Sequence, residues 1–266
     1  AILCVHLGGY PCKMNEIMKF AKKRKLFVIE DCSQAHGAKI NNKFVGTFGD
    51  IATWSFCNDK IISTGGEGGM VATNSKKYWK YLWSYKDQGK NFNKYFKKND
   101  NKLFKYVHDI IGTNYRITEM QAAIGIIQLK KLASWIKIRN KYANILNKVL
   151  KNFDSIRLCK YESNYTNSYY RYYFFINPKF LKKNWTRNKI IKSLNKIKIN
   201  CGSGTCPEIY LEKPFRKFNF TKNTKLSNAK LLGERSISLN IHQNIKLKEM
   251  KDISRSLNNF FSNVTV

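Results

Sequence analysis

The N-terminal stretch AILCVHLGGYPCKMNEIMKFAKKRKLFVIED, residues 1–31, decides the fold. Residues 1–6 form an apolar run that is typical of a buried strand, and the Gly8–Pro11 segment after it predicts a turn. Residues 14–25 carry apolar side chains at helical spacing and end in a basic turn, which suits a helix C-terminus. Residues 26–29 form a second apolar run. Strand, helix and strand in about thirty residues make a βαβ unit, which predicts a parallel sheet.

The next segments extend this sheet. Residues 51–56 read as another strand, and 70–73 as a further one beyond the glycine-rich run Gly65–Gly69. Residues 75–86 have a helical pattern. The polar stretch 89–105, rich in Lys and Asn, predicts a mobile loop. We therefore predict an α/β domain with a mixed, mostly parallel sheet.

A long helical segment opens at Thr118-Glu119 and continues to Leu150. After it the character changes to aromatic strands, among them residues 169–176, and then to the helices 189–198 and from Lys248 onward. We predict two domains: residues 1–135 as part of a large α/β domain, and residues 136–266 as a smaller α+β domain.

Basic residues outnumber acidic ones along the whole chain. Lys and Arg total 49 against 17 Asp and Glu, so the formal net charge is +32. Such an excess raises the question of nucleic acid, but a nucleic-acid binder concentrates its charge on one helix or arm. Here the charge is spread out and accompanied by Asn and Ile, which share A/T-rich codons with Lys. We interpret the excess as genomic base bias and expect no nucleic-acid partner, although an anionic substrate could still benefit from the positive field.

The seven cysteines have irregular spacing and contain no CxxC, so they predict free thiols rather than a zinc site or a disulfide framework. No stretch approaches the roughly eighteen uninterrupted apolar residues of a membrane helix. The chain does not begin with Met, and no signal or transit pattern precedes its first strand. We expect a cytoplasmic enzyme whose sequence, as given, starts in the middle of a fold.

Polar residues gather where the predicted strands end. Asp31 ends one strand, with Gln34 just after it, and Ser55 lies at the end of the next strand with Lys60 just beyond it. In parallel sheets, function sits at the carboxyl ends of the strands. Pyridoxal phosphate needs a lysine for its aldehyde, a carboxylate beside its ring nitrogen, and hydroxyl and backbone donors for its phosphate. These residue types meet those needs at one sheet edge.

Several segments resemble one family, the DegT/DnrJ/EryC1/StrS aminotransferases. They are EDCSQAHGA (30–38), VGTFGDIATWSF (45–56), K-IISTGGEGGM (60–70), NYRITEMQAAIGIIQLKKL (114–132), GSGTCPEIYLEKPF (202–215) and NAKLLGERSISLNIH (228–242). The resemblance implies the aspartate aminotransferase fold (fold type I), pyridoxal 5'-phosphate as cofactor, and a nucleotide-linked keto sugar as substrate. It further implies glutamate as amino donor and a homodimer with shared active sites. The family's N-terminal portion, with its phosphate cup and the aromatic residue over the cofactor ring, has no counterpart here.

The resemblance also implies roles for single residues. Lys60 would form the internal aldimine and shuttle the proton, Asp31 would pair with the pyridinium nitrogen, and Gln34 would lie near the phenolic oxygen of the ring. Ser55 would hydrogen-bond the phosphate, and Asn114 would reach the phosphate of the neighbouring subunit's cofactor. Each has a plainer interpretation. Asp31 could cap the turn after its strand, and Asn114 could stabilise a helix N-terminus. Gln34 and Ser55 could be ordinary loop residues, and Lys60 could be one of the many lysines of this basic chain. We expect no metal ion, because no two histidines are spaced as ligands.

Two other functions stay open. A sugar dehydratase of the same family uses the cofactor to remove a hydroxyl, but such relatives carry histidine in place of the lysine, so Lys60 disfavours it. A catalytically decayed, basic binding protein is the second alternative, and it predicts a steep loss of affinity with salt.

Overall fold

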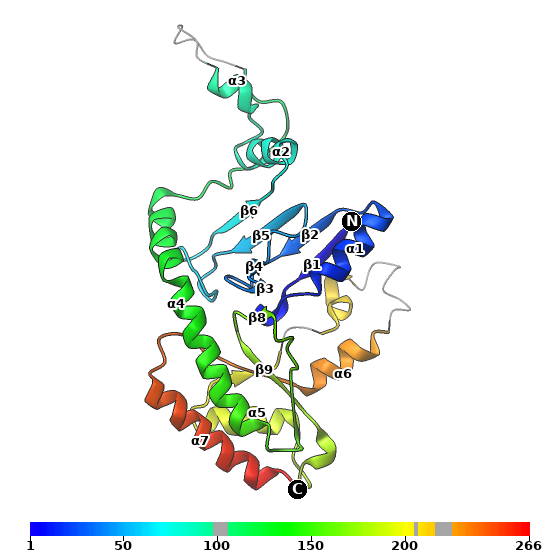
Figure 1. Ribbon diagram of the computed structural model, residues 1–266, viewed down its shortest axis with the longest axis vertical. Coiled ribbons are helices and arrows are strands. Elements are labelled where there is room, and N and C mark those ends of the chain that lie inside the picture. The colour runs from blue at the N-terminus through cyan, green and yellow to red at the C-terminus, as the bar shows by residue number, and fades with distance from the viewer. Residues whose placement is uncertain (98–105, 205–206, 216–224) are drawn as a thin grey trace. The chain divides into compact units, whose positions relative to one another are not determined.

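The computed structural model describes residues 1–97, 106–204, 207–215 and 225–266. The chain forms two compact units (Figure 1). The first unit comprises Ala1–Ala133 with Asn164–Ser168, and the second comprises Ser134–Ser163 with Tyr169–Val266. The predicted domain bounds, 1–135 and 136–266, stay a prediction. They do not anticipate the short return to the first unit at 164–168.

The main sheet of the first unit has the order β1-β2-β5-β6. Its strands are β1 (Ile2–Val5), β2 (Val28–Asp31), β5 (Ile51–Ser55) and β6 (Gly69–Ala72). β1, β2 and β5 are parallel, and β6 is antiparallel to β5. The prediction of a mixed, mostly parallel sheet is confirmed.

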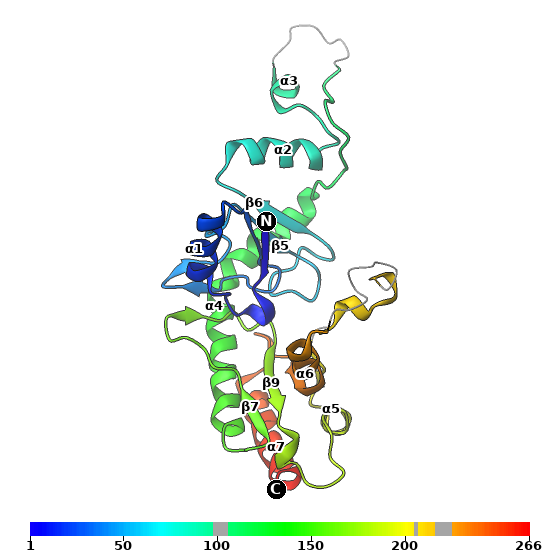
Figure 2. The same ribbon diagram turned by 90° about the vertical axis from the view of Figure 1, so that its right-hand side faces the viewer.

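Helix α1 (Met14–Arg24) connects β1 to β2 and covers one face of the sheet (Figure 2). Its side chains Met14 and Ala21 are buried with Cys4 and Val28 of the two strands. The helix ends at Lys25, which adopts a left-handed backbone with φ of 52°. The predicted βαβ unit is therefore present, and burial of the apolar stripe of α1 against β1 and β2 is its main stabilising contact.

A smaller sheet of the first unit has the order β4-β3-β8. It consists of β4 (Lys43–Phe44), β3 (Lys39–Ile40) and β8 (Tyr165–Thr166), all antiparallel to their neighbours. A 3₁₀ turn, η1 (Leu7–Gly9), follows β1. Ile40 of β3 and Tyr165 of β8 belong to the same apolar cluster as Cys4 of β1 and Val28 of β2.

Helices α2 (Lys76–Lys86) and α3 (Phe92–Phe96) follow β6. The predicted loop over 89–105 is wrong at 92–96, and residues 98–105 lie outside the described part of the chain. The reason is aromatic packing: the ring of Phe92 lies 4.9 Å from that of Trp79 and 5.0 Å from that of Trp83. Contacts between aromatic residues spaced along the chain favour a helix in spite of the polar composition.

Helix α4 (Glu119–Leu150) begins in the first unit and continues into the second. The second unit contains an antiparallel sheet of order β10-β11-β9-β7. Its strands are β7 (Ile156–Leu158), β9 (Tyr172–Ile176), β10 (Cys201–Gly202) and β11 (Ser236–Leu239). The other elements are α5 (Arg187–Lys196), α6 (Ser227–Arg235), α7 (Leu247–Val264), η2 (Pro178–Phe180), η3 (Ile209–Leu211) and η4 (Lys213–Phe215).

The core of the second unit is aliphatic and aromatic. Leu146 of α4, Phe174 of β9 and Phe261 of α7 are fully buried in one cluster, and α7 runs beside the second half of α4 (Figures 1 and 2). This antiparallel sheet with helices packed against it confirms the predicted α+β character of the C-terminal part. Among the described residues, no helix combines the length and apolar character that a membrane crossing requires.

Candidate active site

The carboxyl ends of β1, β2 and β5 meet at one edge of the main sheet. Asp31 is paired in register with Val5 of β1 and Thr53 of β5, and its carbonyl accepts the backbone N–H of His6 at 3.1 Å. The Asp31 side chain is half-buried, and its Oδ1 accepts the backbone N–H of Ser33 at 2.9 Å. Asp31 thus caps the turn after its strand. Among the described residues its other carboxylate oxygen accepts no hydrogen bond, so that oxygen can take another donor.

Gln34 lies in this turn, close to the loop after β1. Its Oε1 accepts the backbone N–H of Gly8 at 2.7 Å, and its carbonyl accepts the Ser168 hydroxyl at 3.3 Å. Because a backbone N–H can only donate, the amide oxygen must face Gly8 and the NH₂ group must point elsewhere. The orientation of the Gln34 amide is therefore set by the main chain.

Ser55 and Lys60 lie at the end of β5 and in the turn after it. The Ser55 hydroxyl accepts the backbone N–H of Cys57 at 3.3 Å, and the carbonyl of Cys57 accepts the backbone N–H of Lys60 at 3.1 Å. The Lys60 side chain is only 16% exposed, and its Nζ lies 3.4 Å from Oδ1 of Asp59. This turn holds a lysine in an enclosed position one strand away from Asp31.

The glycine-rich run forms the next turn, between Lys60 and β6. Gly65 has a φ of 81° and Gly66 a φ of 152°, both in the region that favours glycine. Two glutamines of α4 hold the turn: Gln121 donates to the Glu67 carbonyl at 2.8 Å, and Gln128 accepts the backbone N–H of Ser63 at 2.9 Å. Gly65 and Gly66 are required by the turn itself.

Asn114 has a different environment. It pairs with Asp87 in an isolated bridge, and its Oδ1 accepts the Nε–H of Arg116 at 2.9 Å. Within the described residues, these contacts do not include Asp31, Gln34 or Lys60. Its predicted role concerned the cofactor of a neighbouring subunit, and that role stays a prediction.

The buried pair Glu30 and His6 was not foreseen as part of this site. Both side chains are fully buried, with His6 Nε2 3.1 Å from Oε2 of Glu30. Burial acts to raise the pKa of Glu30, but hydrogen bonds from His6 and three backbone N–H groups outweigh it and hold that pKa below its usual range. The sequence signal that could have indicated this pair is Glu30 next to Asp31 at the end of a strand. Because side chains alternate along a strand, the two carboxylates point to opposite faces of the sheet.

His6, Glu30 and Cys32 bring their potential metal ligands within 4.8 Å of one another. However, both ring nitrogens of His6 are already engaged: Nδ1 accepts the backbone N–H of Cys12 at 2.9 Å, and Nε2 contacts Glu30. This arrangement is a satisfied hydrogen-bond network, and the proximity of these three residues gives no reason to add a metal ion. His36, also buried, packs its ring against that of Phe56 at 5.9 Å.

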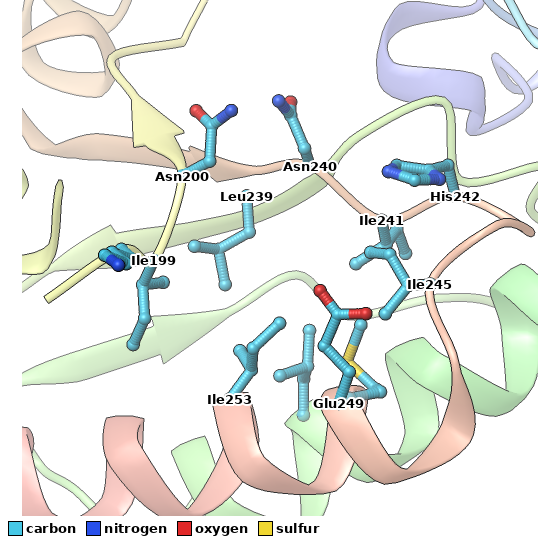
Figure 3. Close-up of a pocket in the computed structure, with 12 residues that line it drawn as sticks. Ile199, Asn200, Leu239, Asn240, Ile241, His242, Ile245, Glu249 and Ile253 are labelled. Atoms are coloured by element: carbon cyan, nitrogen blue, oxygen red, sulfur yellow. The ribbon is translucent and has the colours of Figure 1, made fainter.

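The second unit contains a cavity of about 150 Å³ (Figure 3). Its wall is apolar at Leu239 and Ile253, while Asn240, His242 and Glu249 supply polar groups. Burial and the nearby Arg139 lower the pKa of His242. None of the five predicted site residues lines this cavity.

Taken together, the fold is that of the pyridoxal-phosphate-dependent aminotransferases. The family model for "DegT/DnrJ/EryC1/StrS aminotransferase family" matches residues 1–258. The chain therefore belongs to this family.

Three relatives illustrate the similarity. The aminotransferase from Psychrobacter cryohalolentis superimposes with a TM-score of 0.94 at 38% identity, over 99% of this chain and 69% of that one. GDP-perosamine synthase of Escherichia coli O157:H7 is 47% identical over 148 residues, which are 56% of this chain and 38% of the relative. The protein MJ1066 of Methanocaldococcus jannaschii is 32% identical over 98% of this chain and 67% of its own length.

Proposed function

We propose that this protein transfers an amino group, from glutamate, to a nucleotide-linked keto-deoxy sugar with pyridoxal 5'-phosphate as cofactor. We further propose that it acts in the cytoplasm as a homodimer with shared active sites. The observation that carries the proposal is the enclosed Lys60 one strand away from Asp31, at the edge where parallel strands present their carboxyl ends. Family membership and a relative that is a nucleotide-sugar enzyme support it.

The residues at this edge match the chemistry of the cofactor. Lys60 supplies a primary amine, Asp31 a carboxylate with one oxygen still available, Ser55 a hydroxyl and Gln34 an oriented NH₂ group. When bound, pyridoxal phosphate supplies the electron-accepting ring and the aldehyde that carries nitrogen between the two substrates. We infer that these four residues hold it.

Each residue would contribute a separate action. Lys60 would hold the cofactor through Nζ and, once displaced, use the same nitrogen to move a proton between substrate and cofactor carbons. The low exposure of Lys60 limits water near that nitrogen. Asp31 would keep a proton on the ring nitrogen, because a carboxylate beside that nitrogen favours its charged form. Ser33 N–H would keep the Asp31 carboxylate in position.

The dehydratase alternative is less well supported, because this chain has lysine at position 60. The binding-protein alternative requires that the lysine and carboxylate have lost their chemistry. Every described cysteine is a free thiol, as expected for the cytoplasm, and Cys206 lies outside the described residues.

The absorbance spectrum with added pyridoxal phosphate tests the proposal. We expect a visible band from the lysine-bound cofactor that glutamate converts to the near-ultraviolet band of the aminated form. Lys60→Ala should lack the visible band, whereas Lys23→Ala, at an exposed lysine of α1 in the same unit, should keep it. A band and a glutamate response that survive in Lys60→Ala would refute the assignment.

The sugar is then identified by assay. GDP-linked keto sugars are the first candidates because of the likeness to GDP-perosamine synthase, with UDP- and dTDP-linked ones as comparison. Turnover with none of them, in a protein that responds to glutamate, would leave the half-reaction standing and remove the sugar assignment.

A further inference from the structure

Glu30 organises the turn that precedes β5. Its Oε1 accepts the backbone N–H groups of Phe48 and Gly49 at 2.8 and 2.6 Å, and its Oε2 accepts that of Gly46 at 2.7 Å. Gly46 has a φ of 84°, and a Cβ there would lie 2.3 Å from the Trp54 ring. The 46–49 turn is thus wrapped around one buried carboxylate.

His6 carries this order to the loop after β1. Its Nδ1 accepts the Cys12 N–H, so that nitrogen bears no proton, and Nε2 must be the nitrogen that donates to Glu30. Both ends of the 7–12 loop are thereby held: the start follows His6 directly, and Cys12 is bonded to its ring. His6 N–H also donates to the Asp31 carbonyl.

The 7–12 loop in turn orients Gln34. Gly8 lies in η1, has a φ of 66°, and donates its N–H to Gln34 Oε1 at 2.7 Å. In the described part of the chain, the NH₂ group of Gln34 makes no hydrogen bond, so it is available to a ligand. A continuous series of hydrogen bonds therefore runs from Glu30 through His6 to the loop that fixes the Gln34 amide.

We propose that His6 and Glu30 are positioning residues of the active site, which act through the Gly8 N–H to present the Gln34 NH₂ group to the cofactor. The inference rests on the proposed function. Both side chains are fully buried, so they contact neither substrate nor cofactor themselves. Their effect reaches the site through Gln34, whose N–H would stabilise the anionic form of the ring oxygen.

The test is a pH titration of the visible band of the bound cofactor in four proteins: wild type, His6→Phe, Gln34→Met and the double variant. Losing a hydrogen bond to a charged group should move the titration midpoint by about one pH unit in each single variant. If His6 acts through Gln34, the double variant should show the midpoint of Gln34→Met alone, because the two changes remove the same interaction. Shifts that add in the double variant would overturn the proposal.

A stability control separates positioning from general loosening. Met14→Ala creates a cavity beneath β1 in the same unit, where Met14 is fully buried. It should lower the melting temperature as His6→Phe does while leaving the midpoint at the wild-type value. A Met14→Ala midpoint that moves as far as that of His6→Phe would overturn the proposal.

Three further outcomes also have a defined meaning. If His6→Phe does not fold, His6→Gln takes its place, since glutamine keeps a donor and an acceptor. A smaller midpoint shift that again vanishes on the Gln34→Met background supports the proposal. A midpoint shift that adds to that of Gln34→Met overturns it. A wild-type protein with no visible band at any pH overturns the proposed function and this inference with it. A titrating wild type with an unshifted His6→Phe overturns this inference alone.

Discussion

Glu30 in the first unit and Arg139 in the second are buried charges held by opposite ends of the peptide group. Glu30 accepts three backbone N–H groups, whereas Arg139 donates to the carbonyls of Tyr169, Tyr170 and Ile241 at 2.9, 3.4 and 2.7 Å. Arg139 is 4% exposed, and burial lowers its pKa to about 10. Its charge is balanced by carbonyl dipoles and the Gln243 amide oxygen.

The two buried charges have the same structural role but different surroundings. In each unit a buried charge fixes main-chain segments that have no regular partners of their own. Around Glu30 those segments lead to the proposed active site. Around Arg139 they carry His242, which lies at the cavity of the second unit. We therefore expect substitution of Glu30 to affect both stability and cofactor chemistry, and substitution of Arg139 to affect chiefly stability.

The largest effect is expected at Asp31, the neighbour of Glu30 on β2. Asp31→Asn removes the charge proposed to face the ring nitrogen, so turnover should fall by about 10²–10³-fold, the scale of losing an electrostatic contact in a water-excluded site. Some cofactor should stay bound, and the melting temperature should change little because Asp31 is only half-buried. Steady-state assays and thermal unfolding check this. An unaltered turnover would mean that the Asp31 carboxylate does not serve the chemistry.

Arg139→Met should cause the largest loss of stability. It leaves buried carbonyls without donors, which should cost about 3–5 kcal/mol in the free energy of unfolding. Arg139→Lys should recover less than half, since an ammonium cannot reproduce the planar fork. Denaturant unfolding measures the loss, and faster amide exchange at 239–245 should locate it. Fast exchange at 46–49 instead would contradict the assignment of this charge to the second unit.

Glu30→Gln should cost about 1–3 kcal/mol, because an amide cannot accept all the donors that face the carboxylate. The loss should appear in amide exchange at residues 46–49 and 7–12. The matched exposed control is Glu16→Gln. The Glu16 carboxylate lies on the surface, 3.3 Å from Nζ of Lys13. This substitution should change the free energy of unfolding by less than about 1 kcal/mol. Equal losses of stability in the two variants would contradict the inference that the buried Glu30 carboxylate holds the 46–49 turn.

The stability loss in Glu30→Gln should depend on pH. The folded-state pKa of Glu30 lies below its ordinary value. The contribution of Glu30 to stability is therefore fully present above the unfolded pKa of about 4.3, and it is lost as pH falls through the folded-state pKa. Wild type and Glu30→Gln should thus differ most near neutrality and converge in acid. Unfolding measured from pH 7 to 3 checks this, and a constant difference would contradict it.

The smallest effect concerns a helix cap of the second unit. The Thr186 hydroxyl accepts the backbone N–H of Lys189 at the start of α5. Thr186→Ala should cost about 1 kcal/mol in unfolding free energy and leave the cofactor spectrum unchanged. A changed spectrum would show that the second unit also affects the cofactor. This would contradict the expectation that substitutions in that unit affect chiefly stability.

Most of the fold followed from periodicity. The alternation of apolar runs and helical spacing over 1–31 was enough to predict parallel pairing, because local patterns define both strands and the helix between them. Residues 92–96 were missed because their helix depends on ring contacts with Trp79 and Trp83, which composition does not reveal. β8 was missed because its partner strand lies far away along the chain.

The site was predictable only in part. Asp31 and Lys60 stood out because chemical type and strand ends coincide there. Glu30 and His6 did not, because their importance depends on backbone N–H groups that a sequence does not display. The amide orientation of Gln34 is likewise set by Gly8, 26 positions away, so no spacing rule could indicate it.

The short return of residues 164–168 to the first unit has a practical consequence for dividing the gene. A protein ended at 133 would lose β8 and leave the edge of β3 unpaired, which invites pairing between molecules. It would also lose Ser168, whose hydroxyl donates to the carbonyls of Gly9 and Gln34. The two units are interleaved along the chain, so no single stop codon yields the first unit without part of the second.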